Sequence, residues 1–345
     1  MAIKTYPGLI DAHVHLREPG ATDKEDFYTG SRSAVAGGFT FVLDMPNNPL
    51  PTVSIVRLKE KINLSKKAIC DIGFFYGTDG QNIESFKEAA KNPRVYGLKI
   101  FLNHTTGDLL VHDLAALEEI FKAWNSDKPI AVHAENIELA AAIDLANLYN
   151  RRLHVCHLSL AESVELVRKA KAKKYKITAG ATPHHLFLTG EDRKKLGGYA
   201  DMKPPLGSKK DQTALWQALN DGTIDIVETD HAPHAKAEKE RENPAFGVTG
   251  LETAVGLLFL AVKEKKIKES QIKKLLYDNP RRIFNIPIQL KTSVLINTDK
   301  KWIVGEAGYE TKCGWSPFNG WEVYGKIEKV VLRGKILLEE GEIVL

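Results

Sequence analysis

Histidine is the residue type whose placement in this chain most needs a chemical explanation. The chain contains 11 histidines, and most of them end or directly follow short apolar segments typical of β-strands. These are His13, His15, His133, His157, His184, His185, His231 and His234. Imidazole binds divalent metal ions and exchanges protons near neutral pH. Because a random scatter would not follow the strands, the pattern predicts a metal site with acid–base chemistry.

His13 and His15 form the first candidate ligand pair. They lie two residues apart at the end of a strand, so both imidazoles point to one side and reach one ion. Such a pair alone is a weak signal, because buried imidazoles also serve as structural hydrogen-bonding groups. His133 and His157 end two later strands, and Asp230 follows another. Four histidines and a carboxylate suit a borderline ion such as zinc.

Lys99 is a candidate of another kind, because it lies within GLKIF in a central strand, where an ammonium group is costly to bury. One interpretation is that the amine extends to the strand end and forms an ion pair. The other is that the amine is deprotonated, takes up carbon dioxide and becomes a carbamate that bridges two metal ions. Spacing alone leaves both interpretations open.

Alternating strands and helices must position these groups. Strand patterns cover residues 9–15, 39–45, 71–76, 96–102, 130–133, 153–157, 176–181 and 224–229. Helical periodicity occupies the intervals, for example residues 114–124, 137–149 and 161–173. Eight such strands predict an α/β fold, a (β/α)8 TIM-type barrel, whose strands direct their carboxyl ends to one face. The candidate ligands would meet on that face.

A small β appendage is predicted at the C-terminal end of the barrel. After the run NPRRIF, strand patterns cover residues 293–296, 302–304 and 329–338, with turns at 333–335 and 340–342. We therefore expect a metal-dependent barrel over residues 1–288 and a β-rich appendage over residues 289–345. The appendage should come almost wholly from this C-terminal segment.

Composition excludes several classes of function. The net charge is only +4 and the lysines are scattered, which gives no indication of a nucleic-acid partner. The longest apolar stretch, residues 254–262, is too short to cross a membrane. Cys70, Cys156 and Cys313 form no Cys-x-x-Cys pair, which favours a reducing compartment. We expect a cytoplasmic protein.

Eight sequence blocks carry a family resemblance. They are PGLIDAHVHLREPG (7–20), DMPN (44–47), GLKIFLN (97–103), HAE (133–135), HVCH (154–157), TPHHLFL (182–188), TDHAPH (229–234) and NPRRIF (279–284). With these blocks in order, the chain resembles the dihydroorotases of the amidohydrolase superfamily. It looks most similar to the dihydroorotase domain of the animal multifunctional pyrimidine-synthesis polypeptide. The resemblance implies reversible, zinc-dependent cyclisation of N-carbamoyl-L-aspartate to L-dihydroorotate in de novo UMP synthesis.

The resemblance also implies roles for the candidate ligands. A metal-bridging hydroxide would attack the ring amide, with Asp230 acting as general base and then as general acid. Two zinc ions would share the carbamate of Lys99. One would also be held by His13, His15 and Asp230, and the other by His133 and His157.

Substrate-binding residues follow from the same resemblance. They are Arg17, Asn47, His234, Thr105, Lys203, Phe246 and Gly247. The guanidinium of Arg17 would bind the substrate's α-carboxylate through its two-pronged geometry. The alternative for Arg17 is a structural ion pair with Glu18 or Asp44.

Two departures from the family pattern change the expectations. Relatives often have a glutamate where this chain has Gly180, which puts a third zinc in doubt and makes Cys156 a small buried residue. Thr106 stands where the animal sequence has phenylalanine, so closure of the loop over residues 103–108 would differ.

Two alternative functions stay open. One is a hydantoinase-like cyclic amidase, against which Arg17 argues because such enzymes typically lack arginine there. The other is a non-catalytic scaffold for aspartate transcarbamoylase, against which the retained metal ligands argue. Aspartate transcarbamoylase is also a candidate partner of an active enzyme, and a homodimer is the expected assembly.

Overall fold

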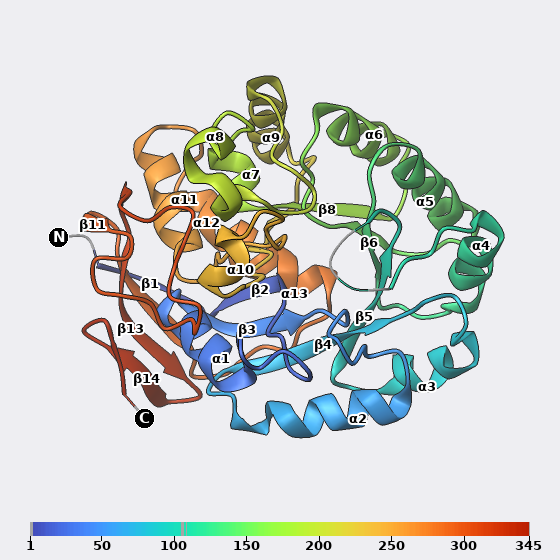
Figure 1. The fold of residues 1–345 in the computed structure, drawn as a ribbon, viewed down its shortest axis with the longest axis horizontal. Coiled ribbons are helices and arrows are strands. Elements are labelled where there is room, and N and C mark those ends of the chain that lie inside the picture. The colour runs from blue at the N-terminus through green and yellow to red at the C-terminus, as the bar shows by residue number, and fades with distance from the viewer. Residues whose placement is uncertain (1–2, 105–106, 108, 345) are drawn as a thin grey trace.

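Eight parallel strands form a nearly closed barrel in the computed structural model, which describes residues 3–104, 107 and 109–344 (Figure 1). The strands are β2 (Leu9–Val14), β3 (Phe39–Asp44), β4 (Asp71–Gly77), β5 (Val95–Phe101), β6 (Ile130–His133), β7 (Leu153–Val155), β8 (Ile177–Ala181) and β9 (Ile226–Val227). Each pairs with the next in chain order. This confirms the predicted barrel, with strand limits shifted by at most a few residues.

The barrel closes through the residues that follow β9. The amide of His15 donates to the carbonyl of His231 at 2.7 Å, and Val14 forms a parallel bridge with His231. The closing contact thus brings the end of β2 next to the segment that carries Asp230.

Helices surround the barrel, and the three that the sequence predicted by range are found with limits shifted by one residue at most. The longer ones are α1 (Phe27–Ala36), α2 (Ile55–Leu64), α4 (Leu114–Ala123), α5 (Asn136–Leu148), α6 (Ala161–Ala172), α9 (Lys209–Asp221) and α11 (Ala254–Lys263). Shorter ones are α3 (Phe86–Lys91), α7 (Pro183–Phe187), α8 (Arg193–Leu196), α10 (Lys236–Glu240), α12 (Ser270–Lys273) and α13 (Asn279–Ile283). Across the part of the chain that the structure describes, no helix has the length and apolar character to cross a membrane.

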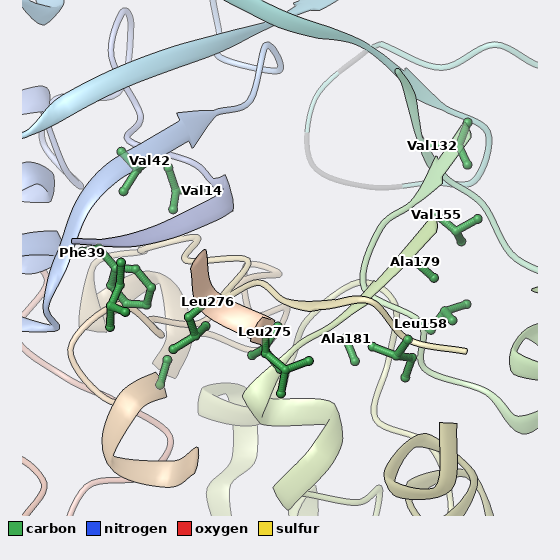
Figure 2. Packing of buried hydrophobic residues seen from close by; sticks show 14 of the residues in the cluster. Val14, Phe39, Val42, Val132, Val155, Leu158, Ala179, Ala181, Leu275 and Leu276 are labelled. Atoms are coloured by element: carbon green, nitrogen blue, oxygen red, sulfur yellow. The ribbon is translucent and has the colours of Figure 1, made fainter. Parts of the chain in front are cut away.

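Successive side chains of each strand point to opposite faces of the sheet and so form two separate apolar layers. Val132, Val155 and Ala179 lie on neighbouring strands and belong to the large cluster between sheet and helices (Figure 2). A second cluster, which includes Ile10, Phe41, Phe75, Ile226 and Phe284, fills the barrel interior. Burial on both sides explains why the strands read as nearly continuous apolar runs. Polar side chains on them are therefore costly and call for a function.

The small sheet combines both ends of the chain. Its order is β1-β10-β13-β14-β15, formed by β1 (Ile3–Tyr6), β10 (Ser293–Asn297), β13 (Lys326–Leu332), β14 (Lys335–Glu339) and β15 (Glu342–Ile343). In Figure 1 the blue N-terminal strand accordingly lies beside the red C-terminal strands. The sequence did not reveal β1, because its partner β10 is almost 300 residues away and the pairing leaves no local pattern.

The predicted turns of the appendage are confirmed, and one strand is reassigned. Arg333, Gly334, Glu340 and Gly341 have positive φ values and connect β13 to β14 and β14 to β15. The segment predicted at residues 302–304 is β11 (Trp302–Ile303), which pairs with β12 (Glu322–Val323) in a separate two-stranded sheet.

Candidate metal centre

Four histidines and Asp230 meet where β2, β6, β7 and β9 end. His13 Nε2 lies 3.3 Å from His15 Nε2 and 3.4 Å from Asp230 Oδ1, and His15 Nε2 lies 3.0 Å from the same carboxylate oxygen. His133 Nδ1 lies 3.1 Å from His157 Nε2. The rings of His13 and His157 join the two groups, with centroids 5.1 Å apart.

These separations fit zinc coordination. Two ligand atoms about 2.1 Å from a tetrahedral ion lie roughly 3.4 Å apart, close to the separations in both groups. The Nδ1 atoms of His13 and His157 are buried and have no hydrogen-bond partner among the described residues. Those Nδ1 atoms lie on the far edges of the two rings. The nitrogens that a cation would hold are the facing ones, His13 Nε2 with His15 Nε2 at 3.3 Å and His133 Nδ1 with His157 Nε2 at 3.1 Å.

Burial sets the protonation state of the cluster. It lowers the pKa of His13, His15, His133 and His157 well below the usual value, so their rings are neutral. Neutral imidazole is the form that binds metal ions. Burial also raises the pKa of Asp230 to about 8. A cation beside this carboxylate would counter that rise.

Lys99 lies fully buried on β5, among the inward-facing groups. Its Nζ is 3.2 Å from Cys156 Sγ and 4.8 Å from the ring centroid of Phe101. No carboxylate of the described residues lies within ion-pairing distance of this amine. The structure therefore does not support the interpretation that Lys99 forms an ion pair at the strand end.

Strained backbone surrounds the centre. Arg17, His157 and Asp230 have φ values of 64°, 37° and 47°, in the left-handed region that non-glycine residues rarely adopt. In addition, the register of β2 against β3 shifts between Asp11 and Val14. Such irregularities concentrate at functional sites, where they direct particular side chains.

Arg17 is a buried cation without a described carboxylate partner. The alternative of an ion pair with Glu18 or Asp44 is not found, because Glu18 pairs with Lys67 at 2.9 Å and Asp44 with Lys61 at 2.6 Å. Arg17 is only 6% exposed, so its charge is costly unless an anion approaches it.

Neutral groups hold the Arg17 guanidinium in place. Its Nε donates to the carbonyl of Pro233 at 2.9 Å, and its Nη2 lies 3.0 Å from His234 Nε2. Burial, together with the charges of Arg17 and Lys24, lowers the pKa of His234 to about 3. The ring of His234 is therefore neutral and adds no competing charge.

One cavity connects the metal ligands with the predicted substrate contacts. It is lined by His13, His15, Arg17, Asn47, Phe101, His133, His157, Lys203, Asp230, Ala232, Phe246 and Gly247. Lys203 Nζ lies 4.7 Å from the ring centroid of Phe246. Of the predicted site residues, Lys99 and His234 do not line this cavity, and His234 contacts Arg17, which does. Thr105 and the substituted Thr106 lie outside the described residues.

Other histidines at strand ends have structural contacts instead. His185 Nδ1 lies 2.7 Å from Thr182 Oγ1, and its Nε2 lies 3.1 Å from the carbonyl of Pro204. His231 Nδ1 accepts from the amide of Gly250 at 3.2 Å. Position at a strand end was thus not enough to identify a ligand.

Two buried carboxylates were missed in the sequence. Asp11 Oδ1 accepts from the amides of His13 at 3.2 Å and Thr229 at 3.1 Å, and Glu228 Oε1 accepts from the amide of His157 at 2.7 Å. Asp11 and Glu228 precede His13 and Asp230 by two residues. Residues two apart on a strand point to the same side, so this spacing could have indicated that both carboxylates lie near the ligands.

Comparison with known sequences shows a family match over most of the chain. Residues 5–286 match the model of the amidohydrolase family. The chain is 40% identical to the multifunctional protein CAD of Squalus acanthias over 98% of its own length, which is 15% of that protein. It is 35% identical to a dihydroorotase of Lactobacillus gasseri, covering 97% of this chain and 88% of that protein.

A solved structure shares the whole fold. The inactive dihydroorotase-like domain of a CAD-like multifunctional protein from Chaetomium thermophilum superposes with a TM-score of 0.84 and 26% identity. The match covers 100% of this chain and 97% of that domain.

Proposed function

The chain belongs to the amidohydrolase family, and we propose that it is a zinc-dependent dihydroorotase that interconverts N-carbamoyl-L-aspartate and L-dihydroorotate in pyrimidine biosynthesis. Relatives named dihydroorotase match nearly its full length. The reaction makes and breaks a cyclic amide bond, which requires a hydrolytic centre. Its substrates carry carboxylates, which require a cationic group beside that centre.

The observation that carries this proposal is the buried guanidinium of Arg17 beside the histidine cluster. Dihydroorotate bears a carboxylate next to its ring nitrogen, and a guanidinium binds such a group with two parallel hydrogen bonds. Arg17 and His15 line the same cavity as Asn47. A ring held through its carboxylate by Arg17 would thus present its amide to the metal ligands.

Two zinc ions fit the donor set. His13, His15 and Asp230 would hold one, His133 and His157 the other, and the carbamate of Lys99 would bridge them. The uncompensated burial of the Lys99 amine supports this modification, since uptake of carbon dioxide replaces a positive charge by a ligand. Bound zinc lowers the pKa of water and polarises a carbonyl oxygen.

Asp230 is proposed to transfer the proton. Its carboxylate would accept a proton from the attacking water and deliver it to the ring nitrogen that leaves as the amide bond breaks. The backbone of Lys203, Phe246 and Gly247 would contact the ring edge, and Asn47, His234 and Thr105 the remaining polar groups.

The two alternative functions have different support. Similarity to an inactive dihydroorotase-like domain supports the non-catalytic part of the scaffold alternative. However, six metal-binding positions are occupied by competent ligands, and buried polar groups are costly unless used. A hydantoinase-like reaction leaves the charge of Arg17 without a partner.

Partner, assembly and location complete the proposal. Aspartate transcarbamoylase is proposed as a partner in addition to catalysis, and a homodimer as the assembly. Cys70, Cys156 and Cys313 are all free and buried, which supports a cytoplasmic location.

A turnover assay tests the proposed function. The purified, zinc-replete chain is incubated with bicarbonate and then with dihydroorotate at alkaline pH or carbamoyl aspartate at mildly acidic pH. Hydantoin and allantoin serve as parallel substrates. We expect turnover of the first two only. No turnover of any ring by a protein with two bound zinc ions would favour the scaffold role.

A further inference from the structure

Glu228 is a buried carboxylate that the proposed reaction does not use. It is 1% exposed and directly follows β9. Among the residues that the structure describes, only two histidine rings lie within ion-pairing distance of it, His154 at 3.4 Å and His13 at 3.8 Å. No described lysine or arginine compensates its charge. A carboxylate in this environment is expensive to bury and requires an explanation.

The contacts of Glu228 lead to both halves of the metal centre. Its Oε1 accepts a hydrogen bond of 2.7 Å from the amide of His157, a residue whose φ of 37° is strained. Its Oε2 faces Nδ1 of His13, the nitrogen on the opposite side of the ring from the one that approaches His15 and Asp230. One carboxylate thus touches the backbone of one ligand and the outer ring edge of another.

Gly180 on β8 provides the space for this carboxylate. A Cβ at position 180 would lie 2.4 Å from Glu228 Oε1 and 2.6 Å from its Cδ, and the three nearest heavy atoms all belong to Glu228. The φ of Gly180 is not in the left-handed region. Backbone conformation therefore does not require glycine there, whereas the position of Glu228 does.

We propose that Glu228, in the space left by Gly180, is a positioning residue that holds His13 and His157 for the two proposed zinc ions. The negative charge of the carboxylate, 3.8 Å from Nδ1 of His13, favours the tautomer that carries its proton there and leaves Nε2 free as a ligand atom. Its hydrogen bond to the amide of His157 fixes the strained backbone of that residue. Acceptors behind ligand histidines orient the rings and increase their basicity. This inference rests on the zinc centre of the proposed function but not on its substrate.

The test measures zinc affinity in the full chain, independently of turnover. Glu228→Gln and Gly180→Ala are compared with wild type by chelator competition and by the visible spectrum of the cobalt-substituted protein. Neither substitution alters a ligand of the two proposed zinc ions. Loss of a partner behind the ligands typically weakens metal binding about 10- to 100-fold, so we expect this loss and an altered cobalt spectrum in both variants.

Gly73→Ala is the matched control for the glycine variant. Gly73 also lies in a buried strand, and a Cβ there would lie 2.5 Å from the ring of Tyr96. We expect it to lower the melting temperature without changing the zinc affinity of the folded protein.

An exchange of positions provides the sharpest test. In Gly180→Glu/Glu228→Ala the carboxylate reaches the same space from β8, so zinc affinity should recover most of what Glu228→Ala loses. Gly180→Ala/Glu228→Ala, which restores volume without charge, should not recover it. Unchanged zinc affinity and cobalt spectrum in Glu228→Gln would overturn the proposal, as would equal recovery in both double variants. Turnover measured in parallel tests the proposed function separately, because its absence would leave these affinity shifts unaffected.

Discussion

At the scale of single residues, this protein is defined by buried charges without the usual partners. Arg17 and Lys99 are buried, and no described carboxylate forms an ion pair with either. By contrast, buried Lys61 has Asp44 at 2.6 Å. Uncompensated burial of a charge costs several kcal/mol, so such groups persist where a ligand or a covalent change relieves the cost.

Replacement of Arg17 by methionine tests the carboxylate-binding role. Methionine keeps most of the volume but removes the charged hydrogen bonds, worth about 3 kcal/mol, so KM for dihydroorotate should rise roughly 100-fold. Zinc content should be unchanged. Steady-state kinetics and metal analysis check both. Arg57→Met, which removes an exposed pair with Glu60, is the control, and an unchanged KM in Arg17→Met would contradict the role.

Replacement of Lys99 by alanine tests the proposed bridge. Without the amine no carbamate forms, so the chain should lose turnover and at least one zinc ion. Carbon NMR with labelled bicarbonate should show a carbamate signal in wild type that Lys99→Ala lacks. Lys61→Met removes another buried amine, on α2 and paired with Asp44, and should retain the signal. Two zinc ions and full activity in Lys99→Ala would exclude the bridge.

At the scale of secondary-structure elements, the strand ends set the geometry of the site. β2 contributes His13, β6 ends at His133 and His157 follows β7, so no single element contains more than part of the centre. The register shift in β2 and the left-handed residues after β7 and β9 turn side chains toward the barrel axis.

A half-buried glutamate connects three further elements and should make their docking pH-dependent. Glu252, just before α11, accepts from Ser33 Oγ of α1 at 3.0 Å and from the amides of Glu310 and Thr311 at 3.0 and 2.9 Å. Burial is the main cause that raises its pKa from 4.5 to about 7. Between these values the folded state keeps a proton that the unfolded state loses.

Stability from Glu252 should therefore decrease as pH rises from about 4.5 to about 7, by roughly 3 kcal/mol in total. Glu252→Gln lacks this titration. The melting temperature of wild type, compared with that of the variant, should therefore be more favourable near pH 5 than near pH 8. Glu60→Gln, at an exposed ion pair, should show no such trend. A difference independent of pH would contradict the pKa shift.

At the scale of the whole molecule, closure of the barrel makes one site from distant parts of the chain. His13 and Asp230 are more than 200 residues apart in sequence, yet the atoms they would offer to a metal lie 3.4 Å apart. Metal ligands drawn from opposite ends of the barrel sequence should couple metal binding to the stability of the entire domain.

Removal of metal should accordingly destabilise the whole protein. At a free zinc concentration about 100 times Kd, binding adds roughly 2.7 kcal/mol, which corresponds to a rise of a few degrees in Tm. Calorimetry after treatment with a chelator should show the loss, and added zinc should reverse it. Calcium, which prefers oxygen ligands, is the control ion. An unchanged Tm would show that the cluster does not hold zinc.

The sequence by itself determined the barrel, its helices and the residues that converge at its mouth. Strand and helix periodicity is local, and the strand-end position of His13, His133, His157 and Asp230 follows from parallel topology. Only the tertiary structure decided which polar groups meet. It added β1 to the small sheet, left Arg17 and Lys99 without described carboxylate partners, and placed Glu228 in the space beside Gly180. These are contacts between segments far apart in the chain, and local patterning carries no information about them.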